Sequence, residues 1–392
     1  MSIDEYVFTN QIILKLVGLY PTSVIRCLVC LLCMLLIVIP QVIQIYFNRY
    51  DLAVILETSS VLLTILLAML KSIVWILNQN TMESLVRFML TDYWKIAEIL
   101  DDTHYFITYA KSARKVTKSY LILIFNALLF FFSLPPIEIL IAKTNGALNV
   151  DKHFPFSATY PTFCYESFSF EVIYASQMIA TIVCGLVILA TDTLIATALL
   201  HTCGHFAILQ KNLMKLNDDL DYIKHLTNNS KKLDEISRIL RQKMFRLVKH
   251  HQIIIRFSDD MEKAFSPIML LQVFASNLII CLVGLQVSTT LTDRYKLIQY
   301  SSYLLMALFQ LLLFCWPGDN LIVQSSMVSK TAYSVNWYEA SILIKAEILF
   351  IILRSQKPSC ITAGKFYVMC LENFSTVLST SLSYFTVLRS LN

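Results

Sequence analysis

Long runs of apolar residues alternate with polar segments along the chain. An α-helix needs about 20 mostly apolar residues to cross roughly 30 Å of hydrocarbon. Seven runs reach that length: residues 24–46, 56–78, 119–141, 171–200, 267–291, 297–316 and 366–390. A shorter apolar run at 341–353 contains Lys345 and Glu347, which favours a helix packed on protein over an eighth span. The pattern predicts an all-α polytopic membrane protein with seven transmembrane helices.

The composition agrees with a chain that has lipid as part of its solvent. Hydrophobic residues make up 56% of the sequence and charged residues 15%, a balance that ordinary globular cores cannot bury. The net charge of +5 comes from basic residues between the apolar runs rather than from one basic patch. We therefore expect membrane lipids as partners and no nucleic acid.

The distribution of Lys and Arg between the loops predicts the orientation in the membrane, because cytoplasmic loops are enriched in both residues. The segments after the second, fourth and sixth runs are the basic ones. The opposite side has only Arg49, Lys143, Lys152, Arg294, Lys296 and Arg389. The difference is about fourfold, and it predicts a cytoplasmic N-terminus and an extracellular C-terminus. A G-protein-coupled receptor has the reverse orientation.

The long basic segment after the fourth run has helical character. Apolar residues recur at helical spacing through residues 205–263, so the fourth and fifth spanning helices are expected to continue as helices into the cytoplasm. Asn228, Asn229 and Ser230 interrupt the spacing and predict the turn between the two helices.

Asn228 also begins an Asn-x-Ser sequon, the acceptor for N-glycosylation in the secretory lumen. We predict that Asn228 stays unmodified in cells, because the expected orientation keeps it in the cytoplasm. The electrophoretic mobility of the chain should be the same for the wild type and an Asn228→Gln variant, with and without endoglycosidase. Sugar at Asn228 would contradict the orientation.

Four ionisable residues lie within the apolar runs. Charge at the middle of a spanning helix costs about 2.5–3.5 kcal/mol, so each is a functional candidate. We expect Lys71 to extend to the inner membrane interface, and Glu138 and Glu171 to lie near the outer one. Asp192 lies deeper in its run, and we expect it to have a polar partner inside the helical bundle.

Few residues suggest catalytic chemistry. His201 and His205 flank Cys203, a spacing that could begin a metal site. No third acidic or thiolate ligand follows at a useful spacing, which favours packing at the end of the fourth run. The chain has only 7 glycines and no glycine-rich phosphate loop. We expect no enzyme, no cofactor and no metal.

The polar residues of the last apolar run share one face of the expected helix, because steps of three and four bring side chains to the same side. This stripe consists of Glu372, Thr376, Thr380, Ser383, Val387 and Ser390 with Leu391. Repeated around a symmetry axis, it would form a hydroxyl-lined pore with a carboxylate near the inner end and an apolar constriction near the outer end. Alternatively, the hydroxyl residues are ordinary helix-packing contacts.

The outer halves of the second, third, fourth and sixth runs combine aromatic and aliphatic residues with few charges. Such a mixture suits a small apolar ligand that has one or two polar groups. It equally suits lipid-facing or core packing. The candidate ligand-binding residues are Leu62, Ile65, Leu66, Leu128, Phe131, Phe132, Tyr174, Gln177, Met178, Tyr300, Tyr303 and Leu304.

The last third of the chain resembles the insect odorant receptor family. The residues that support this resemblance are Gln310-Leu311, Cys315-Trp316-Pro317-Gly318, Ser325-Ser326, Ala332-Tyr333, Trp337-Tyr338, Ser355-Gln356-Lys357-Pro358, Ala363-Gly364-Lys365-Phe366 and Ser383-Tyr384-Phe385-Thr386-Val387-Leu388. The fourth run adds Glu171, Tyr174, Gln177 and Asp192, followed by His205-Phe206. The resemblance covers most of the chain and is specific from about residue 299 onward.

The resemblance implies a tetrameric, odorant-gated, non-selective cation channel in which tuning subunits assemble with a shared co-receptor. Its last helix would line the pore, with Val387 and Leu391 at the outer gate and Ser390 and Glu372 where the co-receptor has a glutamine and an aspartate. Residues about 320–355, including Tyr333, Trp337 and Tyr338, would belong to an intracellular anchor between subunits. The plasma membrane of olfactory sensory neuron dendrites would be its location.

The chain differs from the co-receptor in lacking its longer second cytoplasmic loop and in having Arg389 near its end, so it resembles a tuning receptor. The expected segments are 1–200 with the first four spanning helices, 201–266 with the cytoplasmic extensions of the fourth and fifth, 267–316 with the fifth and sixth spans, 317–365 with the anchor helix and 366–392 with the pore helix. The alternatives are a gustatory-type channel, a G-protein-coupled receptor or a transporter. A transporter would usually show internal repeats or broken helices.

Overall fold

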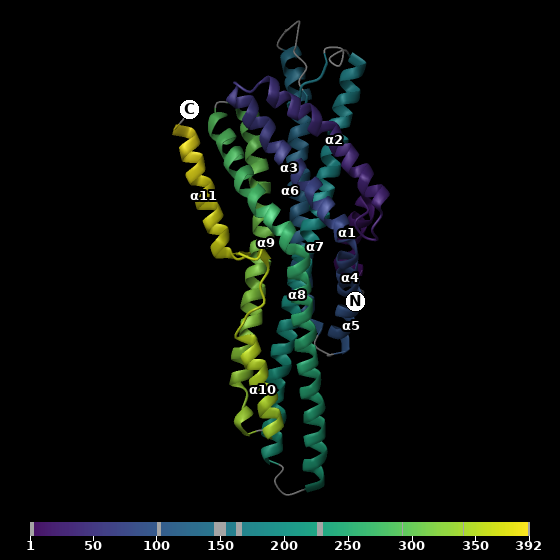
Figure 1. Ribbon diagram of the computed structural model, residues 1–392, viewed down its shortest axis with the longest axis vertical. Coiled ribbons are helices and arrows are strands. Elements are labelled where there is room, and N and C mark those ends of the chain that lie inside the picture. Colours follow the sequence, from purple (N-terminus) through teal and green to yellow (C-terminus); the bar gives the residue numbers. More distant parts are fainter. Residues whose placement is uncertain are drawn as a thin grey trace.

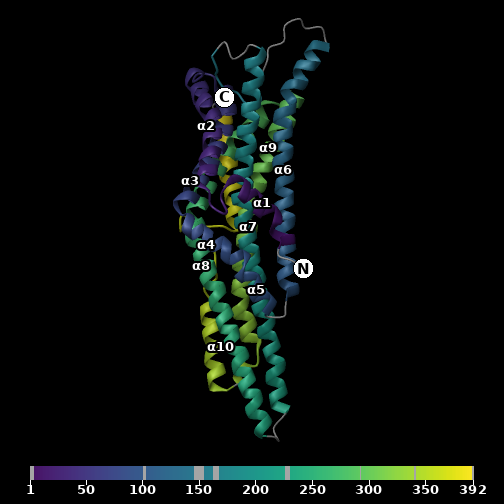
Figure 2. The same ribbon diagram turned by 90° about the vertical axis from the view of Figure 1, so that its right-hand side faces the viewer.

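A computed structural model describes residues 4–99, 103–144, 154–161, 167–225, 230–291, 293–339 and 341–390. Figures 1 and 2 show an elongated bundle of helices. The helices are α1 (Asp4–Val17), α2 (Val24–Phe47), α3 (Leu52–Leu77), α4 (Gln79–Leu90), α5 (Asp92–Ile99), α6 (Thr103–Thr144), α7 (Ser167–His225), α8 (Ser230–Thr289), α9 (Arg294–Ser334), the 3₁₀ turn η2 (Trp337–Glu339), α10 (Ile342–Ser355) and α11 (Leu371–Ser390). The all-α class expected from the sequence is confirmed.

Six helices of the described chain are long and apolar enough to cross a membrane: α2, α3, α6, α7, α8 and α9. They contain the first six predicted spans, apart from the last residue of the second and the last two of the fifth, which lie beyond the ends of α3 and α8. The chain is therefore a multi-pass membrane protein. The seventh predicted span differs from the structure at its start. Residues 367–368 belong to a short hairpin, and α11 begins only at Leu371. With its many hydroxyl residues, α11 is not among the six apolar helices.

The hairpin before α11 pairs β1 (Thr362–Ala363) with β2 (Tyr367–Val368) in antiparallel register. Gly364 in the connecting turn has a φ of 63°, a left-handed conformation that glycine adopts without a steric penalty. In Figure 1 the hairpin lies near mid-height, and α11 rises from it along the side of the bundle. The turn therefore determines where α11 begins and which way it runs.

The helices α7 and α8 contain 59 and 60 residues. At 1.5 Å per residue each is about 90 Å long, roughly three times the hydrocarbon thickness. Their lower parts project below most of the other helices, together with α10 and the lower part of α9 (Figure 1). The helical continuation expected between residues 205 and 263 is present on both sides of the predicted turn. Asn228 and Asn229 themselves lie outside the described residues.

The short apolar helix α10 packs on protein, as its length and charges predicted. It contacts α9 and α8, and Ile344, Ile348 and Ile351 are buried at this contact. The opposite face of α10 is exposed in the single chain, with Leu343 and Phe350 at 57% and 71% exposure. The division of the chain into five functional segments stays a prediction.

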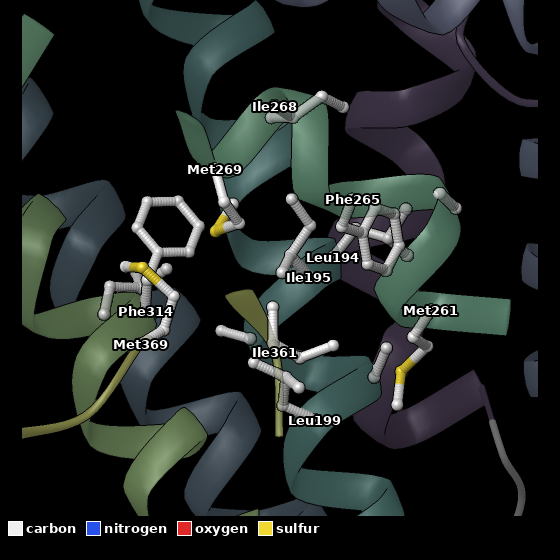
Figure 3. Close-up of a cluster of buried hydrophobic side chains, with 14 of the residues drawn as sticks. Leu194, Ile195, Leu199, Met261, Phe265, Ile268, Met269, Phe314, Ile361 and Met369 are labelled. Carbon is white, nitrogen blue, oxygen red and sulfur yellow. The ribbon is translucent and has the colours of Figure 1, made fainter. Parts of the chain in front are cut away.

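The central element of the bundle is α7, which is buried on all sides from Val187 to Phe206. This stretch includes the polar residues Asp192, His201 and His205, which would be costly to expose to lipid. Other helices cover it, since α7 contacts α1, α2, α3, α6, α8 and α9. Figure 3 shows one layer of this core, in which α7, α8, α9 and the segment around the hairpin meet. The labelled side chains are Leu194, Ile195, Leu199, Met261, Phe265, Ile268, Met269, Phe314, Ile361 and Met369.

The prediction that Lys71 extends to the membrane interface is wrong. Lys71 is completely buried, and its Nζ lies 2.5 Å from Oδ1 of Asp192. The side of α3 that carries Lys71 faces α7 and α8, so the ammonium group meets the Asp192 carboxylate and the Gln272 side chain before it can reach water. The polar partner expected for Asp192 is therefore Lys71. Glu138 lines a hollow that also contains Lys296, and Glu171 is exposed.

Candidate ligand pocket and pore helix

Four helices enclose an apolar pocket. It comprises about 560 Å³ of space that protein atoms do not fill, part of which is open to the surroundings of the chain. The lining comes from α3, α6, α7, α9 and the segment before α7, and it contains no charged side chain. The lining residues are Val61, Thr64, Ile65, Ile124, Ala127, Leu128, Phe131, Phe156, Thr181, Cys184, Gly185, Ile188, Tyr303 and Met306.

The few polar groups of this pocket already have partners within the protein. The Tyr303 hydroxyl lies 2.5 Å from the Thr64 hydroxyl and 3.0 Å from the carbonyl oxygen of Ser60. The Thr181 hydroxyl donates to the Gln177 carbonyl oxygen at 2.8 Å. Because these hydroxyls have partners within the protein, the empty pocket leaves no hydroxyl without a hydrogen bond. Each hydroxyl can also rotate to bond to a ligand. The pocket therefore suits a small, mainly apolar molecule with one or two polar groups.

Phe156 closes one end of the pocket. Its backbone N–H donates to Oε1 of Gln177 at 3.1 Å, and Nε2 of Gln177 donates to the Phe156 carbonyl oxygen at 3.3 Å. The Phe156 ring stacks on Phe131 with centroids 5.0 Å apart. The neighbouring Ser157 hydroxyl donates to Glu57 at 2.8 Å. One amide side chain thus satisfies both backbone groups of Phe156 and fixes its ring over the pocket.

A second, polar hollow lies on the other side of Phe156. Pro155, Ser157 and Ala158 line it, so the segment 154–161 separates the two spaces. The remaining lining residues are Gln44, Glu57, Leu134, Pro135, Glu138, Phe154, Lys296, Gln299 and Tyr300. The segment 154–161 thus borders an apolar pocket through Phe156 and a polar hollow through Phe154, Pro155, Ser157 and Ala158.

Four of the twelve ligand-binding candidates line the apolar pocket: Ile65, Leu128, Phe131 and Tyr303. Four others lie beside it. Gln177 holds Phe156, Phe132 meets the Phe156 ring edge-on, the Tyr174 hydroxyl donates to the Phe132 carbonyl oxygen at 2.7 Å, and Tyr300 lines the polar hollow.

The other four candidates do not line the pocket. Leu62, Leu66 and Leu304 are partly buried and pack against the core, and Met178 is partly exposed. They are neighbours in sequence of pocket residues, but they point to other sides of their helices. A role in ligand binding for any of the twelve stays a prediction.

Sequence reasoning missed ten lining residues, and for five of them the reason is that it selected bulky side chains. Small or polar residues such as Thr64, Ala127, Cys184 and Gly185 create the space, and aromatic rings only bound it. One signal was present. The lining residues of α7 are 181, 184, 185 and 188, a helical stripe with steps of three and four. Phe156 had no comparable signal, since it lies in an irregular segment.

The predicted stripe on α11 faces away from the rest of the chain. Val377 and Ser381 are buried and face the bundle, where the Ser381 hydroxyl lies 3.5 Å from the Asn277 carbonyl oxygen of α8. The described members of the stripe are all exposed: Glu372, Thr376, Thr380, Ser383 and Val387. The side chain of Ser390 and the whole of Leu391 lie outside the described residues. The stripe is therefore accessible and not used for packing within this chain.

The stripe's hydroxyls bond to their own helix. Thr376 donates to the carbonyl oxygen of Glu372 at 3.2 Å, Thr380 donates to that of Thr376, and Ser383 donates to that of Ser379 at 2.9 Å. Each hydroxyl keeps an acceptor site free for water or an ion. Such a face is poorly suited to lipid and well suited to an aqueous pore.

The three anchor candidates differ in exposure. Tyr333 and Tyr338 are 68% and 60% exposed, whereas Trp337 is partly buried against the core. The rings of Trp337 and Tyr338 meet edge-on with centroids 6.4 Å apart. Together with the exposed face of α10 they form an apolar surface on the projecting part of the molecule.

The histidines of the fourth run belong to a packed aromatic cluster. The His201 ring lies 5.1 Å from Phe106 and 5.7 Å from Trp94 between centroids. Nδ1 of His205 lies 3.1 Å from Nε2 of His250. Among the residues the structure describes, no group of three or more potential metal ligands occurs. Packing explains these side chains.

A multi-pass helical membrane protein with an enclosed apolar pocket and an exposed hydroxyl-bearing last helix defines a class of membrane receptor. The family model for the 7tm odorant receptors matches residues 51–382. The chain belongs to this family. The family is one of odorant receptors and not of enzymes.

Individual relatives agree with this assignment. The chain is 32% identical over 297 residues to odorant receptor 13a of Drosophila melanogaster. This alignment covers 71% of this chain and 66% of that receptor. It is 27% identical to odorant receptor 10 of Aedes albopictus over 57% of this chain and 56% of that one. These alignments span just under two thirds and just over half of the relatives' own lengths. Odorant receptor 82a of Drosophila melanogaster is 22% identical, with 90% and 88% covered.

The fold is similar to that of a solved insect receptor. The olfactory receptor OR5 of Machilis hrabei in complex with eugenol superposes with a TM-score of 0.75 at 20% identity, covering 94% of this chain and 89% of that one. A second solved structure of the same receptor gives a TM-score of 0.74 at 18% identity. At this identity the likeness concerns the fold alone.

Proposed function

We propose that this chain is the odorant-binding subunit of a ligand-gated, non-selective cation channel. The observation that supports it most directly is the enclosed, uncharged pocket between α3, α6, α7 and α9 in a member of the odorant receptor family. The pocket suits a small volatile organic molecule, and the solved relative in complex with eugenol supports such a ligand class. Binding opens the channel only as far as the ligand's affinities for the closed and open states differ.

In this proposal α11 lines the pore of a heterotetramer that contains the family's co-receptor. The exposed stripe from Glu372 to Val387 supports this role, because its hydroxyls face open space in the single chain. Val387 and Leu391 would form the outer constriction, which gates by excluding water. Glu372 would lie toward the cytoplasm, as the loop charges predict.

The exposed apolar surface of Tyr338 and α10 supports a contact between subunits. It lies on the projecting lower part of the bundle (Figure 2), which the loop charges assign to the cytoplasm. A face of this kind needs cover from another protein surface when it lies outside lipid. The complex would be located in the plasma membrane of olfactory sensory neuron dendrites.

Whole-cell recording tests the proposal. Cells expressing the chain with and without the co-receptor would be exposed to a panel of small phenols including eugenol, esters, alcohols and terpenes. We expect an inward cation current that needs both chains and persists when G-protein signalling is blocked. A current that disappears under this block would favour a G-protein-coupled mechanism, and complete silence across the panel would count against the channel.

Val387→Ser should raise the basal current of the complex by on the order of a few-fold, because a hydroxyl at the constriction holds water that the isopropyl group excludes. Val387 is 57% exposed and lies on the stripe. Leu382→Ser is the matched control, since Leu382 is 62% exposed on α11 but lies off the stripe. Equal basal currents and permeability ratios for Val387→Ser and wild type, at equal surface expression, would contradict the gate.

Gly185→Ala should reduce sensitivity to the larger ligands of the panel about tenfold, the effect of overfilling a packed site. A Cβ at Gly185 would lie 3.2 Å from Cγ2 of Ile124 and 3.6 Å from Cδ1 of Leu128, so it takes space from the pocket. Concentration–response curves measure the effect. The smallest active ligand serves as the internal control, and an equal loss for ligands of all sizes would argue against a pocket at Gly185.

A further inference from the structure

Five fully or almost fully buried polar residues meet at the centre of the bundle. We call them the polar centre: Lys71, Tyr120, Asp192, Gln272 and Gln310. Nζ of Lys71 lies 2.5 Å from both Oδ1 of Asp192 and Oε1 of Gln272. Nε2 of Gln310 donates to Oδ2 of Asp192 at 2.7 Å, and the Tyr120 hydroxyl lies 3.5 Å from the same oxygen. One residue each from α3, α6, α7, α8 and α9 is therefore joined in a single network.

The polar centre forms a layer next to the apolar pocket. Every helix that lines the pocket enters it within one or two turns of a lining residue. The pairs are Thr64 with Lys71, Ile124 with Tyr120, Ile188 with Asp192 and Met306 with Gln310. Because α6 runs opposite to the other three, all four steps lead to the same side of the pocket. A ligand that shifts any of these helices along or around its axis disturbs the same hydrogen bonds.

Two contacts lead from the polar centre toward α11. Nζ of Lys71 lies 5.5 Å from the ring centroid of Phe314, and Figure 3 shows Met369 beside Phe314. Met369 comes two residues before Leu371, where α11 begins. Lys71 therefore bonds to Asp192 of α7, a helix that lines the pocket. On its other side it contacts Phe314, which lies beside the residues that precede α11.

The second contact runs through α8. Among the described residues that line the pocket, none belongs to α8, yet Gln272 of α8 bonds directly to Lys71. Less than two turns further along α8, the carbonyl oxygen of Asn277 lies 3.5 Å from the Ser381 hydroxyl of α11. At this depth the link between the pocket helices and the helix that supports α11 is polar and directional.

Stability alone does not explain a buried ion pair. Well-packed apolar residues of similar volume are often as stabilising or more so. A hydrogen-bonded network has discrete arrangements, whereas an apolar contact yields gradually. Energetic coupling between two sites requires an element with discrete states, and both sites must influence the equilibrium between those states.

We propose that the polar centre couples occupancy of the apolar pocket to the position of α11, with Lys71 as the positioning residue that contacts Asp192, Gln272 and Phe314 between the two. The inference rests on the proposed function. Neither Lys71 nor Asp192 lines the pocket or the stripe, so both act through other residues. Removing the ion pair should separate binding from opening.

The test is the double variant Lys71→Met with Asp192→Leu, which replaces the pair by apolar side chains. Surface biotinylation measures delivery, and the rise in melting temperature caused by the ligand measures binding by the solubilised complex with the co-receptor. The probe is the panel compound that evokes the largest wild-type current. We expect normal delivery and an unchanged ligand-induced rise, with a maximal evoked current about tenfold lower, within the usual range of coupling between sites.

The matched control removes another buried polar contact between helices. Nδ2 of Asn10 in α1 lies 3.0 Å from the Thr197 hydroxyl in α7, away from the pocket lining. Asn10→Leu with Thr197→Val should keep the wild-type ratio of evoked current to surface receptor. If this control loses current as the test variant does, the effect is structural and the proposal is wrong.

A second variant decides the question if the first does not reach the surface. Lys71→Arg keeps the charge but presents a planar fork instead of a point charge. It should bind the ligand normally and open less. Wild-type maximal currents in every delivered variant of the polar centre would overturn the coupling while leaving the proposed function intact. A wild-type complex that binds the panel compounds without any current would overturn the proposed function and the inference with it.

Discussion

Gly318→Ala is expected to displace the start of α11, to lower the stability of the fold by about 1–3 kcal/mol, the cost of overpacking a core, and to remove most of the odorant-evoked current. A Cβ at Gly318 of α9 would overlap the carbonyl oxygen of Met369 and lie 3.3 Å from the Met369 Cβ. The overlap is with backbone, so no side-chain rotation relieves it. Residues 369–371 must then move, and α11 moves with them.

Gly284→Ala is the matched control for this variant. Gly284 is also a helical glycine, in α8, and a Cβ there would meet no other atom within 4 Å. Alanine should stabilise that helix slightly, since glycine costs about 0.5–1 kcal/mol in a helix interior. Melting curves of the detergent-solubilised complex, followed by size-exclusion chromatography, measure both variants. A Gly318→Ala melting temperature at or above that of Gly284→Ala would contradict the close approach of Met369.

Apolar periodicity carried most of the information about the fold. The first six predicted spans lie within α2, α3, α6, α7, α8 and α9 to within two residues at their ends, because each run is long enough to need lipid on its surface. The seventh could not be delimited in the same way. Its apolar run continues through residues 366–370, whereas the backbone there forms the end of a hairpin whose turn depends on Gly364 and on pairing between Thr362 and Val368.

The pocket was harder to predict than the helices that enclose it. A side chain's direction follows from the helix period, so Ile65, Leu128 and Tyr303 could be selected on their own helices. The assembled bundle determines which helix faces meet at the pocket. A search for side chains that could bind a ligand does not select small residues such as Gly185. Phe156 reaches the pocket only because Gln177, more than 20 residues later, binds its backbone.

The ion pair at the centre could not be predicted from sequence for a related reason. Lys71 and Asp192 are separated by 121 positions, and each lies alone in an apolar run. A single lysine in such a run is consistent with extension to the interface or with a buried partner. Only the packing of α3 against α7 and α8 decides between them, and this packing depends on apolar contacts that many sequences could make.

Lys71→Met alone should therefore prevent most of the chain from reaching the cell surface. In this variant the Asp192 carboxylate would keep the hydrogen bond from Gln310 but lose the positive charge of Lys71. Breaking a buried ion pair in this way lowers the stability of the fold by about 3–5 kcal/mol. Lys243→Met is the matched control, because the Lys243 bridge to Asp219 is 49% and 31% exposed and such pairs contribute about 0–1 kcal/mol. Surface biotinylation and the melting temperature of the solubilised complex compare the two.

Adding Asp192→Leu to Lys71→Met should restore delivery, because the uncompensated charge is then gone. Normal delivery of Lys71→Met, or no recovery in the double variant, would show that the pair is not the buried contact described here.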